Sequence, residues 1–455
     1  MSDYGRILRE TYGGRKWICA GAVVLEGVNV GTTLRDLGAE VLALGATRGT
    51  GDIPDWITTI DLDIGPSPDL MSGMRAAEAA LANLPAWARE ELDRFDPEGT
   101  ARVTTSIWGG LQEVGGRRVF GARRPSWVAL EDKTRAESIW DAAGIARAPA
   151  AVVALERDAI DAAWSDVDGG HGVVVAQDNT EGWHGGAVGT RWLRTRAEIE
   201  ALVDEYRGHA ERVRVMPFLE GLPCSIHGWV IDDEVIAFRP VEMVVLCVGG
   251  TSRFHYAQAA SFWDAPEALE REMRDAARAV GRHLRDTYGF RGSFTIDGIA
   301  TDEGFRPNEL NPRFGAAFGK LTRGIPELHA YPLHLATVEG TVPGLDAAAL
   351  ESDVLRLSRE HRDGGGMALA SRSMDERKLE LDYRDGAWSE SAKEQGDASA
   401  VLGPHPSGSI VFLRLNPETT PHGAPVGGRI AEGLRFLDKL WELDLGALEP
   451  APAAR

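Results

Sequence analysis

The chain has 455 residues, of which 43% are hydrophobic and 26% are charged, so it is long enough for about two to four globular domains and does not have the composition of a disordered or fibrous protein. Its formal net charge of -20 excludes nucleic acid and anionic membranes as general partners. No apolar run approaches the roughly 20 residues of a membrane-spanning helix, and the three cysteines lack the spacing of a zinc or redox pair. We therefore expect a cytoplasmic protein.

The N-terminal region has the pattern of a parallel α/β sheet. An apolar strand at 17–25, a helix at 30–37 and a second strand at 40–44 predict a strand–helix–strand unit. The glycines in this unit do not form G-x-G-x-x-G, so a dinucleotide site is disfavoured and the glycines are interpreted as turn residues. A Pro-, Gly- and Arg-rich stretch at 115–125 predicts a connection to the next domain.

A second domain is predicted to begin near Ser126. Residues 131–143 have helical spacing and end at Gly144, and a long amphipathic helix is predicted at 265–288. Strands are predicted at 173–176, 212–218, 225–231 and 235–238.

The pattern is weaker after Arg323. It predicts helices at 331–338 and 430–443 and strands at 367–370 and 410–415. We predict three domains: residues 1–125, residues 126–330 with a small lid subdomain at about 150–215, and residues 331–455.

The segment at 289–319 is the most informative part of the sequence. Two alternating runs flank Asp302-Glu303-Gly304, which predicts a hairpin with a three-residue loop. If Thr301 pairs with Phe305, Asp297 lies opposite Glu309 and Thr295 lies opposite Asn311, with all four side chains on one face.

Two carboxylates that face each other across a hairpin repel unless a cation lies between them. Carboxylate and amide oxygens are ligands that suit Mg²⁺ and not zinc, and Mg²⁺ commonly also binds substrate phosphates. Asp297, Glu309 and Asn311 are therefore predicted to form a magnesium site for a nucleotide. The alternative is a solvated acidic hairpin with a different register.

The run NELNPRFG, with Asp297 on the preceding strand, resembles the ATP-grasp superfamily. In that family an acidic residue and a following E-x-N hold Mg²⁺ ions that bridge the phosphates of ATP. The resemblance implies that Arg313 faces the transferred phosphoryl group and that Lys133 reaches a phosphate, both as catalytic residues. A lone lysine on a helix is otherwise simply solvated.

Two further segments follow in the order that the resemblance implies. Residues 181–186 lie where the family has a flexible loop, so Gly182, Gly185 and Gly186 are expected to close over the phosphates. Residues 215–221 resemble the hinge that binds adenine, with contacts from Met216, Phe218 and Leu219. An ordinary turn and an ordinary buried strand are the alternatives.

The chain departs from the family pattern at two positions. Many relatives have a second phosphate-binding lysine where this chain has Ala176 and Gln177, and a glutamate where it has Met216. We expect Gln177 to contact the nucleotide, and Arg239 or Arg253 to neutralise phosphate charge, with Arg253 as a catalytic residue. Each arginine could instead be an ion-pair partner.

The resemblance implies an ATP-grasp fold of the α/β (α+β) class, with an N-terminal Rossmann-like pre-ATP-grasp domain and a C-terminal α+β extension. The nearest subgroup is that of the pheganomycin-type peptide ligases, through PCSIHG at 223–228 and the three-part layout. The expected function is ATP-dependent formation of an amide or peptide bond through an acyl phosphate, in specialised metabolism.

The expected cofactors are ATP and Mg²⁺, and the expected partners are one carboxylate and one amine, each a small molecule or a peptide. Two alternatives stay open: an enzyme that phosphorylates a carboxylate or bicarbonate for a non-amine acceptor, and an inactive nucleotide-binding regulatory protein. A homodimer is one possible assembly, and neither nucleic acid nor a membrane is expected as a partner.

Overall fold

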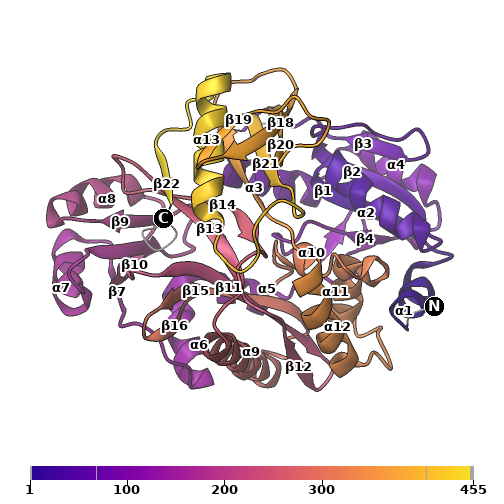
Figure 1. The fold of residues 1–455 in the computed structure, drawn as a ribbon. Coiled ribbons are helices and arrows are strands. Elements are labelled where there is room, and N and C mark those ends of the chain that lie inside the picture. The colour runs from indigo at the N-terminus through magenta and orange to yellow at the C-terminus, as the bar shows by residue number, and fades with distance from the viewer. Residues whose placement is uncertain (1–2, 68, 406, 451–455) are drawn as a thin grey trace.

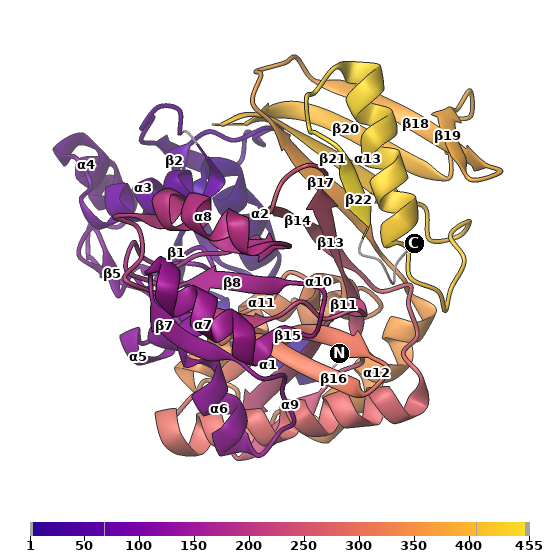
Figure 2. The ribbon, with the colours of Figure 1, turned by 90° about the vertical axis from the view of Figure 1, so that its left-hand side faces the viewer.

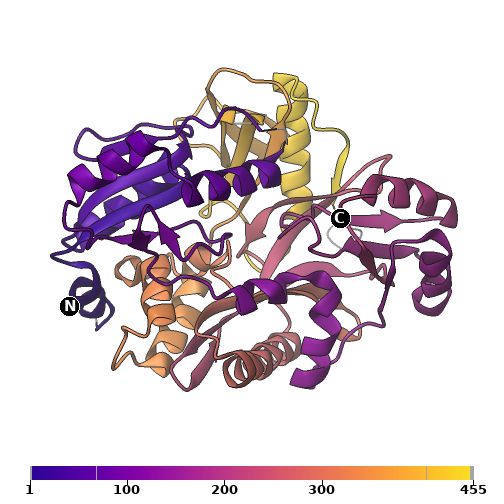
Figure 3. The ribbon, with the colours of Figure 1, turned by 180° about the vertical axis from the view of Figure 1, so that it is seen from behind.

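The computed structural model describes residues 3–67, 69–405 and 407–450. These residues form four sheets of four or more strands and one two-stranded ribbon, with helices along the whole chain, so the predicted mixed α/β class is confirmed. Figures 1, 2 and 3 show three of these sheets, with their helices, arranged around the sheet that contains β11 and β13 to β16. None of the described helices is long and apolar enough to cross a membrane.

The N-terminal sheet is parallel, with the strand order β3-β2-β1-β4. Helix α2 follows β1 directly, so the predicted strand at 17–25 is two residues too long. Gly27 lies within α2 and not in a turn. Only glycine fits there, because a Cβ would come within 2.2 Å of the carbonyl oxygen of Cys19. The elements of this region are α1 (Asp3–Tyr12), β1 (Lys16–Val23), α2 (Val24–Asp36), β2 (Glu40–Thr47), β3 (Thr58–Asp61), α3 (Leu70–Ala82), α4 (Ala86–Phe95), β4 (Arg102–Thr104), β5 (Glu113–Val114) and β6 (Arg117–Arg118).

The helix predicted at 131–143 is shorter in the structure. Short 3₁₀ turns occupy 129–131 and 133–135, and the α-helix begins only at Ala136. Asp132 is the cause, because it has an extended backbone and its carboxylate accepts a hydrogen bond from the Thr134 N–H. The elements of this connection are α5 (Pro125–Val128) and α6 (Ala136–Ala143).

A small antiparallel sheet, which we call the lid sheet, has the strand order β7-β10-β8-β9. It lies at the left of Figure 1 and faces the viewer in Figure 2. Its elements are β7 (Ala151–Ala154), α7 (Arg157–Val167), β8 (Val173–Gln177), β9 (Thr190–Leu193), α8 (Ile199–Tyr206) and β10 (Arg212–Pro217).

The central sheet contains the predicted hairpin and has the order β14-β13-β11-β15-β16. Helix α9 packs on β11 and β12, on the lower side of the sheet in Figure 1. Two of its strands, β13 and β14, are not predicted from the sequence. The elements are β11 (Leu222–Ile231), β12 (Glu234–Ala237), β13 (Val241–Val248), β14 (Phe254–Ala260), α9 (Glu267–Tyr288), β15 (Gly292–Thr301) and β16 (Gly304–Asn311).

Residues 318–450 pack against the N-terminal region and against the central sheet. Helices α10 to α12 share a hydrophobic core with α1 and β11, whereas the C-terminal sheet and α13 share one with β13 and β14. The domain boundaries at 125 and 330 stay a prediction. The elements are α10 (Phe318–Leu321), α11 (Ala330–Glu339), α12 (Ala347–Glu360), β17 (Gly365–Ala370), β18 (Arg377–Arg384), β19 (Ala387–Glu390), β20 (Ala398–His405), β21 (Gly408–Leu415), α13 (Gly427–Trp441) and β22 (Leu448–Pro450).

Candidate active site

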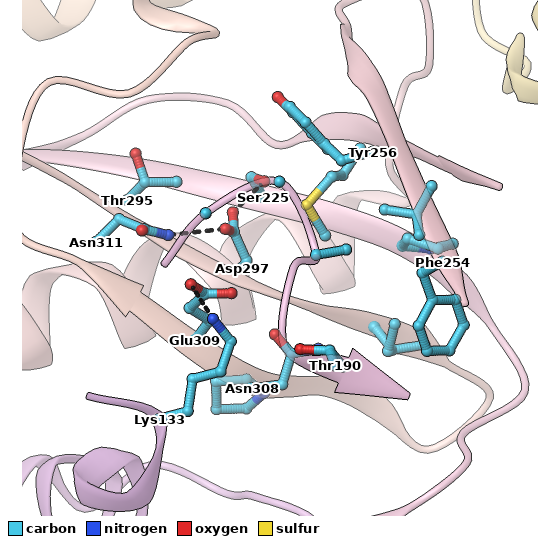
Figure 4. A pocket seen from close by; sticks show the side chains of 18 of the residues that line it. Lys133, Thr190, Ser225, Phe254, Tyr256, Thr295, Asp297, Asn308, Glu309 and Asn311 are labelled. Atoms are coloured by element: carbon cyan, nitrogen blue, oxygen red, sulfur yellow. Dashed lines mark hydrogen bonds and ion pairs between the residues drawn. The ribbon is translucent and has the colours of Figure 1, made fainter. Parts of the chain in front are cut away.

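A cavity of about 260 Å³ lies between the lid sheet and the central sheet. Strands β13, β14, β15 and β16 line one side of it, and β8, β10 and the loop between β8 and β9 line the other. Figure 4 shows the acidic and amide side chains of the hairpin at one end of this cavity and Phe254 at the other. The same cavity therefore contains a polar end and an apolar end.

The β15–β16 hairpin brings together the residues that the sequence singles out, although its turn differs from the prediction. Thr301 pairs with Gly304 and not with Phe305, so the turn is one residue shorter than expected. A β-bulge between Asp297 and Gly298 then shifts the register by one residue. Asp297 consequently faces Glu309, as predicted, and Thr295 also faces Asn311.

Asp297 and Glu309 have different neighbours. Asp297 accepts hydrogen bonds from Ser225 Oγ, at 2.5 Å, and from Asn311 Nδ2, at 2.8 Å. Burial and the nearby Glu309 carboxylate raise the pKa of Asp297 well above the usual range of a carboxyl group. Glu309 forms an ion pair of 2.9 Å with Lys133 Nζ. Figure 4 shows the Asn311–Asp297 and Lys133–Glu309 contacts on the cavity side of the hairpin.

The donors at this end of the cavity fit a hard divalent cation. Two carboxylates face each other here, and Asn311 lies beside them, with its Nδ2 donating to Asp297 and its Oδ1 accepting from Arg313. The described part of the chain contains no group of three or more His, Cys, Asp and Glu side chains that could hold a metal ion, so Asn311 would have to complete this donor set. The donor chemistry thus suits Mg²⁺.

Arg313 lines the same cavity and is buried, with 7% of its surface exposed. Its Nη2 donates to Asn311 Oδ1 at 2.8 Å, and its Nε donates to Glu131 Oε1 at 3.0 Å. Its guanidinium carbon lies 3.9 Å from the centre of the Trp108 ring. Arg313 is therefore held beside the carboxylate pair by three different contacts.

The predicted glycine loop at 181–186 lies beside the cavity, but only some of its glycines line it. Gly185 and Gly186 line the cavity, whereas Gly182 does not. Gln177 is also absent from the lining, because its amide contacts His184 Nε2 at 2.7 Å. Burial lowers the pKa of His184 to about 4, so the ring is neutral at physiological pH.

The predicted hinge residues Met216, Phe218 and Leu219 all line the cavity. Phe218 stacks on Trp192 of β9, with ring centroids 3.8 Å apart, and its N–H donates to the carbonyl oxygen of Gly172 at 3.0 Å. The hinge is therefore fixed to the lid sheet.

The structure does not bring Arg239 and Arg253 to the cavity. Arg239 is buried and donates to the carbonyl oxygens of Ser261 and Trp263. Arg253 is 63% exposed and lies 3.7 Å from Glu205. Both arginines thus have the ion-pair or structural contacts that were the alternative to phosphate binding.

Sequence reasoning missed Arg214, which lies on β10 directly opposite Ala176. Its side chain is 3% exposed, lines the cavity and pairs with Glu137 while donating to the Asn308 carbonyl oxygen at 2.6 Å. Burial lowers the pKa of this guanidinium, which nevertheless stays charged. Arg214 thus places a cation opposite Ala176, the position at which the resemblance implies a phosphate-binding lysine. A lone arginine on a strand does not predict a phosphate-binding role, because the strand that pairs with it decides which residue it faces.

No protein-family model matches the chain. The D-alanine–D-alanine ligase of Mycobacterium ulcerans is 26% identical over 316 residues, which cover 62% of this chain and 82% of the ligase. Two solved structures have a similar fold. One is the biotin carboxylase domain of the Hydrogenobacter thermophilus 2-oxoglutarate carboxylase with MgADP, ADP and bicarbonate, with 12% identity, coverage of 88% and 86%, and a TM-score of 0.55. The other is an ADP complex of N5-carboxyaminoimidazole ribonucleotide synthetase, with 14% identity, coverage of 94% and 98%, and a TM-score of 0.52.

Proposed function

We propose that this chain, which has the ATP-grasp fold, is an ATP-dependent ligase that activates a carboxylate as an acyl phosphate and couples it to an amine. The observation that supports this most directly is the pairing of Asp297 with Glu309 inside a cavity that also contains Lys133, Arg214 and Arg313. Opposed carboxylates surrounded by cations fit a magnesium–nucleotide complex and have no comparable use in an ordinary β-hairpin.

The residues have distinct roles under this proposal. Asp297, Glu309 and Asn311 would hold Mg²⁺, which neutralises phosphate charge when bound. Lys133 and Arg214 provide further positive charge for the phosphates, and Arg313 stabilises the charge on the transferred phosphoryl group. The hinge at 216–219 and the apolar wall of β13 and β14 provide the surface for the adenine ring.

The reaction has two steps. An oxygen of the substrate carboxylate attacks the γ-phosphorus of ATP, the bond to the ADP oxygen breaks, and an acyl phosphate forms. The nitrogen of a neutral amine then attacks the acyl carbon, phosphate leaves, and the nitrogen loses a proton as the amide forms. The loop over the cavity excludes water, which would otherwise hydrolyse the acyl phosphate.

An amine acceptor is favoured over other acceptors because a relative with 26% identity to this chain is named D-alanine–D-alanine ligase. The structural neighbours include a biotin carboxylase domain, but their identities of 12% and 14% support the fold alone. A cytoplasmic location, a place in specialised metabolism and kinship with the pheganomycin-type ligases are part of the same proposal.

Isotope transfer tests the acyl phosphate directly. The protein is incubated with Mg²⁺, ATP, pools of carboxylic acids labelled with ¹⁸O in the carboxylate, and pools of amines. We expect phosphate that carries one ¹⁸O atom, because the attacking carboxylate oxygen stays on phosphorus when the amide forms. Unlabelled phosphate would contradict the mechanism, and ATP binding without any ADP would support the regulatory alternative.

A further inference from the structure

The loop between β8 and β9, residues 178–189, contacts the N-terminal region at several points, and we call it the lid loop. Trp183 Nε1 donates to Glu78 Oε2 of α3 at 3.1 Å, and Glu181 lies 3.4 Å from Arg75 of the same helix. The other oxygen of Glu78 accepts a hydrogen bond from the Gly110 N–H at 2.7 Å. One carboxylate thus fixes both the lid loop and the N-terminal loop at 105–111.

Trp108 lies at the centre of this contact. Its ring stacks on Trp183, with centroids 5.8 Å apart and planes 17° apart. Gly185 packs on the same ring so closely that a Cβ there would lie 2.4 Å from Trp108 Cζ3. Only glycine fits this approach, so the lid loop and Trp108 are matched in shape.

The ring of Trp108 also contacts the catalytic machinery. The guanidinium of Arg313 lies 3.9 Å from its centre, at a distance typical of a cation–π contact. Arg123 donates to the Trp108 carbonyl oxygen at 2.9 Å and pairs with Glu131, which also accepts from Arg313. Trp108 is therefore held on its backbone side and contacts both the lid loop and Arg313 on its ring side.

We propose that Trp108 and Trp183 are positioning residues: their stacking closes the lid loop on the N-terminal region and, through the Trp108 ring, orients Arg313 toward the transferred phosphoryl group. The series of contacts runs from Glu78 through Trp183, Trp108 and Arg313 to Asn311 of the metal site. An open lid loop removes Trp183 and Gly185 from the Trp108 ring, so we expect closure and correct placement of Arg313 to occur together. The described residues of the N-terminal region that line the cavity are Ile107 and Trp108, so this region acts in catalysis through a contact with the lid and not through a charged group.

Hydrogen–deuterium exchange of the full chain tests closure without any knowledge of the substrates. The variants are Trp108→Ala, Trp108→Phe and Trp183→Ala, with Trp87→Ala as the control, because Trp87 lies on α4 of the same region and is 48% exposed. We expect exchange of the amides of Gly182 and Val188, which are hydrogen-bonded within the lid loop, to be about tenfold faster in both alanine variants. Trp108→Phe should restore part of the protection, and Trp87→Ala should leave it unchanged. Unchanged exchange in Trp183→Ala would overturn the proposal.

A second readout, which rests on the proposed ligase function, is the ratio of amide formed to ADP released. An open lid loop admits water to the acyl phosphate, so we expect this ratio to fall at least about twofold in Trp183→Ala. Trp108→Ala should in addition lower kcat, because Arg313 loses its ring contact, and Trp108→Phe should recover it in part. If the wild type releases no ADP, the ligase function fails while the exchange data still decide on closure. An unchanged ratio in Trp183→Ala, with ADP release intact, would overturn the role in catalysis.

Discussion

Arg214 shows how a single residue changes the chemistry that the sequence implies. A phosphate-binding lysine is absent from β8, where Ala176 stands, but Arg214 on the neighbouring strand lies directly opposite that position. Its guanidinium is buried, pairs with Glu137, donates to the Asn308 carbonyl oxygen and also lines the cavity. A buried guanidinium with remaining donors favours an anionic ligand, so the loss of the lysine does not remove positive charge from this wall.

We expect Arg214→Gln to weaken the binding of Mg²⁺-ADP by about 10- to 100-fold, which corresponds to the loss of one or two hydrogen bonds to a charged group. Isothermal titration calorimetry measures the affinity. Arg212→Gln is the matched control, because Arg212 is on the same strand and the same face but is exposed and does not line the cavity. Equal affinities of the Arg214 variant and the wild type would contradict the role of Arg214 in phosphate binding.

At the residue scale, the sequence predicts the hairpin residues well and the scattered cations poorly. Asp297, Glu309 and Asn311 lie within one local hairpin, so strand alternation together with the pairing of Asp297 with Glu309 places them on one face. Arg214, Trp108 and Glu131 reach the site from other elements, and their positions depend on pairing and packing between segments distant in the sequence. Arg239, which has the same residue type, is instead satisfied by backbone carbonyls.

At the scale of the element, the β15–β16 hairpin reaches the predicted register by a route that the sequence does not indicate. The turn is one residue shorter than predicted, and the bulge, in which Asn308 of β16 is the extra residue, restores the predicted register at Asp297. Bulges are common beside active sites because they change the direction of a side chain, at the cost of a local bend in the bulged strand. An alternating pattern cannot show such a bulge, so the correct pairing of Asp297 with Glu309 follows from two deviations that cancel.

Helix α13 gives a test of how a buried charge affects stability. Glu242 of β13 is 1% exposed and accepts hydrogen bonds from the N–H groups of Val426 and Gly427 at the start of this helix. Burial raises the pKa of Glu242 to about 7, although the two hydrogen bonds oppose the shift. The folded protein therefore binds a proton that the unfolded chain releases near pH 4.3.

This raised pKa fixes the sign of a pH effect. The stabilisation from protonated Glu242 is complete below about pH 4.3 and is lost as the pH rises to about 7. We expect the free energy of unfolding of the wild type to fall, relative to Glu242→Gln, by about 2–3 kcal/mol between pH 4.5 and 8. Urea denaturation at several pH values measures it, with Glu234→Gln, at the exposed start of β12, as the control. Parallel pH profiles of the wild type and Glu242→Gln would contradict the assignment.

At the scale of the whole molecule, three regions surround the site. The lid sheet contacts the N-terminal region through the lid loop, and the C-terminal sheet shares its core with β13 and β14, which form the apolar wall of the cavity. Figure 3 shows the N-terminal sheet and the lid sheet on opposite sides of the central region. The cavity is thus bounded by parts of the chain more than 200 residues apart, and no local sequence pattern predicts that arrangement.

The most direct test of the account is the release of ADP in the presence of Mg²⁺, ATP and pools of acids and amines. The comparison is between the wild type, Glu309→Gln and Glu303→Gln. Glu303 is the matched control, since it lies in the turn of the same hairpin, is 84% exposed and pairs with Arg306 at the surface. We predict that ADP release requires both an acid and an amine, falls on the order of 100-fold or more in Glu309→Gln and stays within about twofold in Glu303→Gln. ADP release by Glu309→Gln at the wild-type rate would contradict the metal site and, with it, the proposed ligase mechanism.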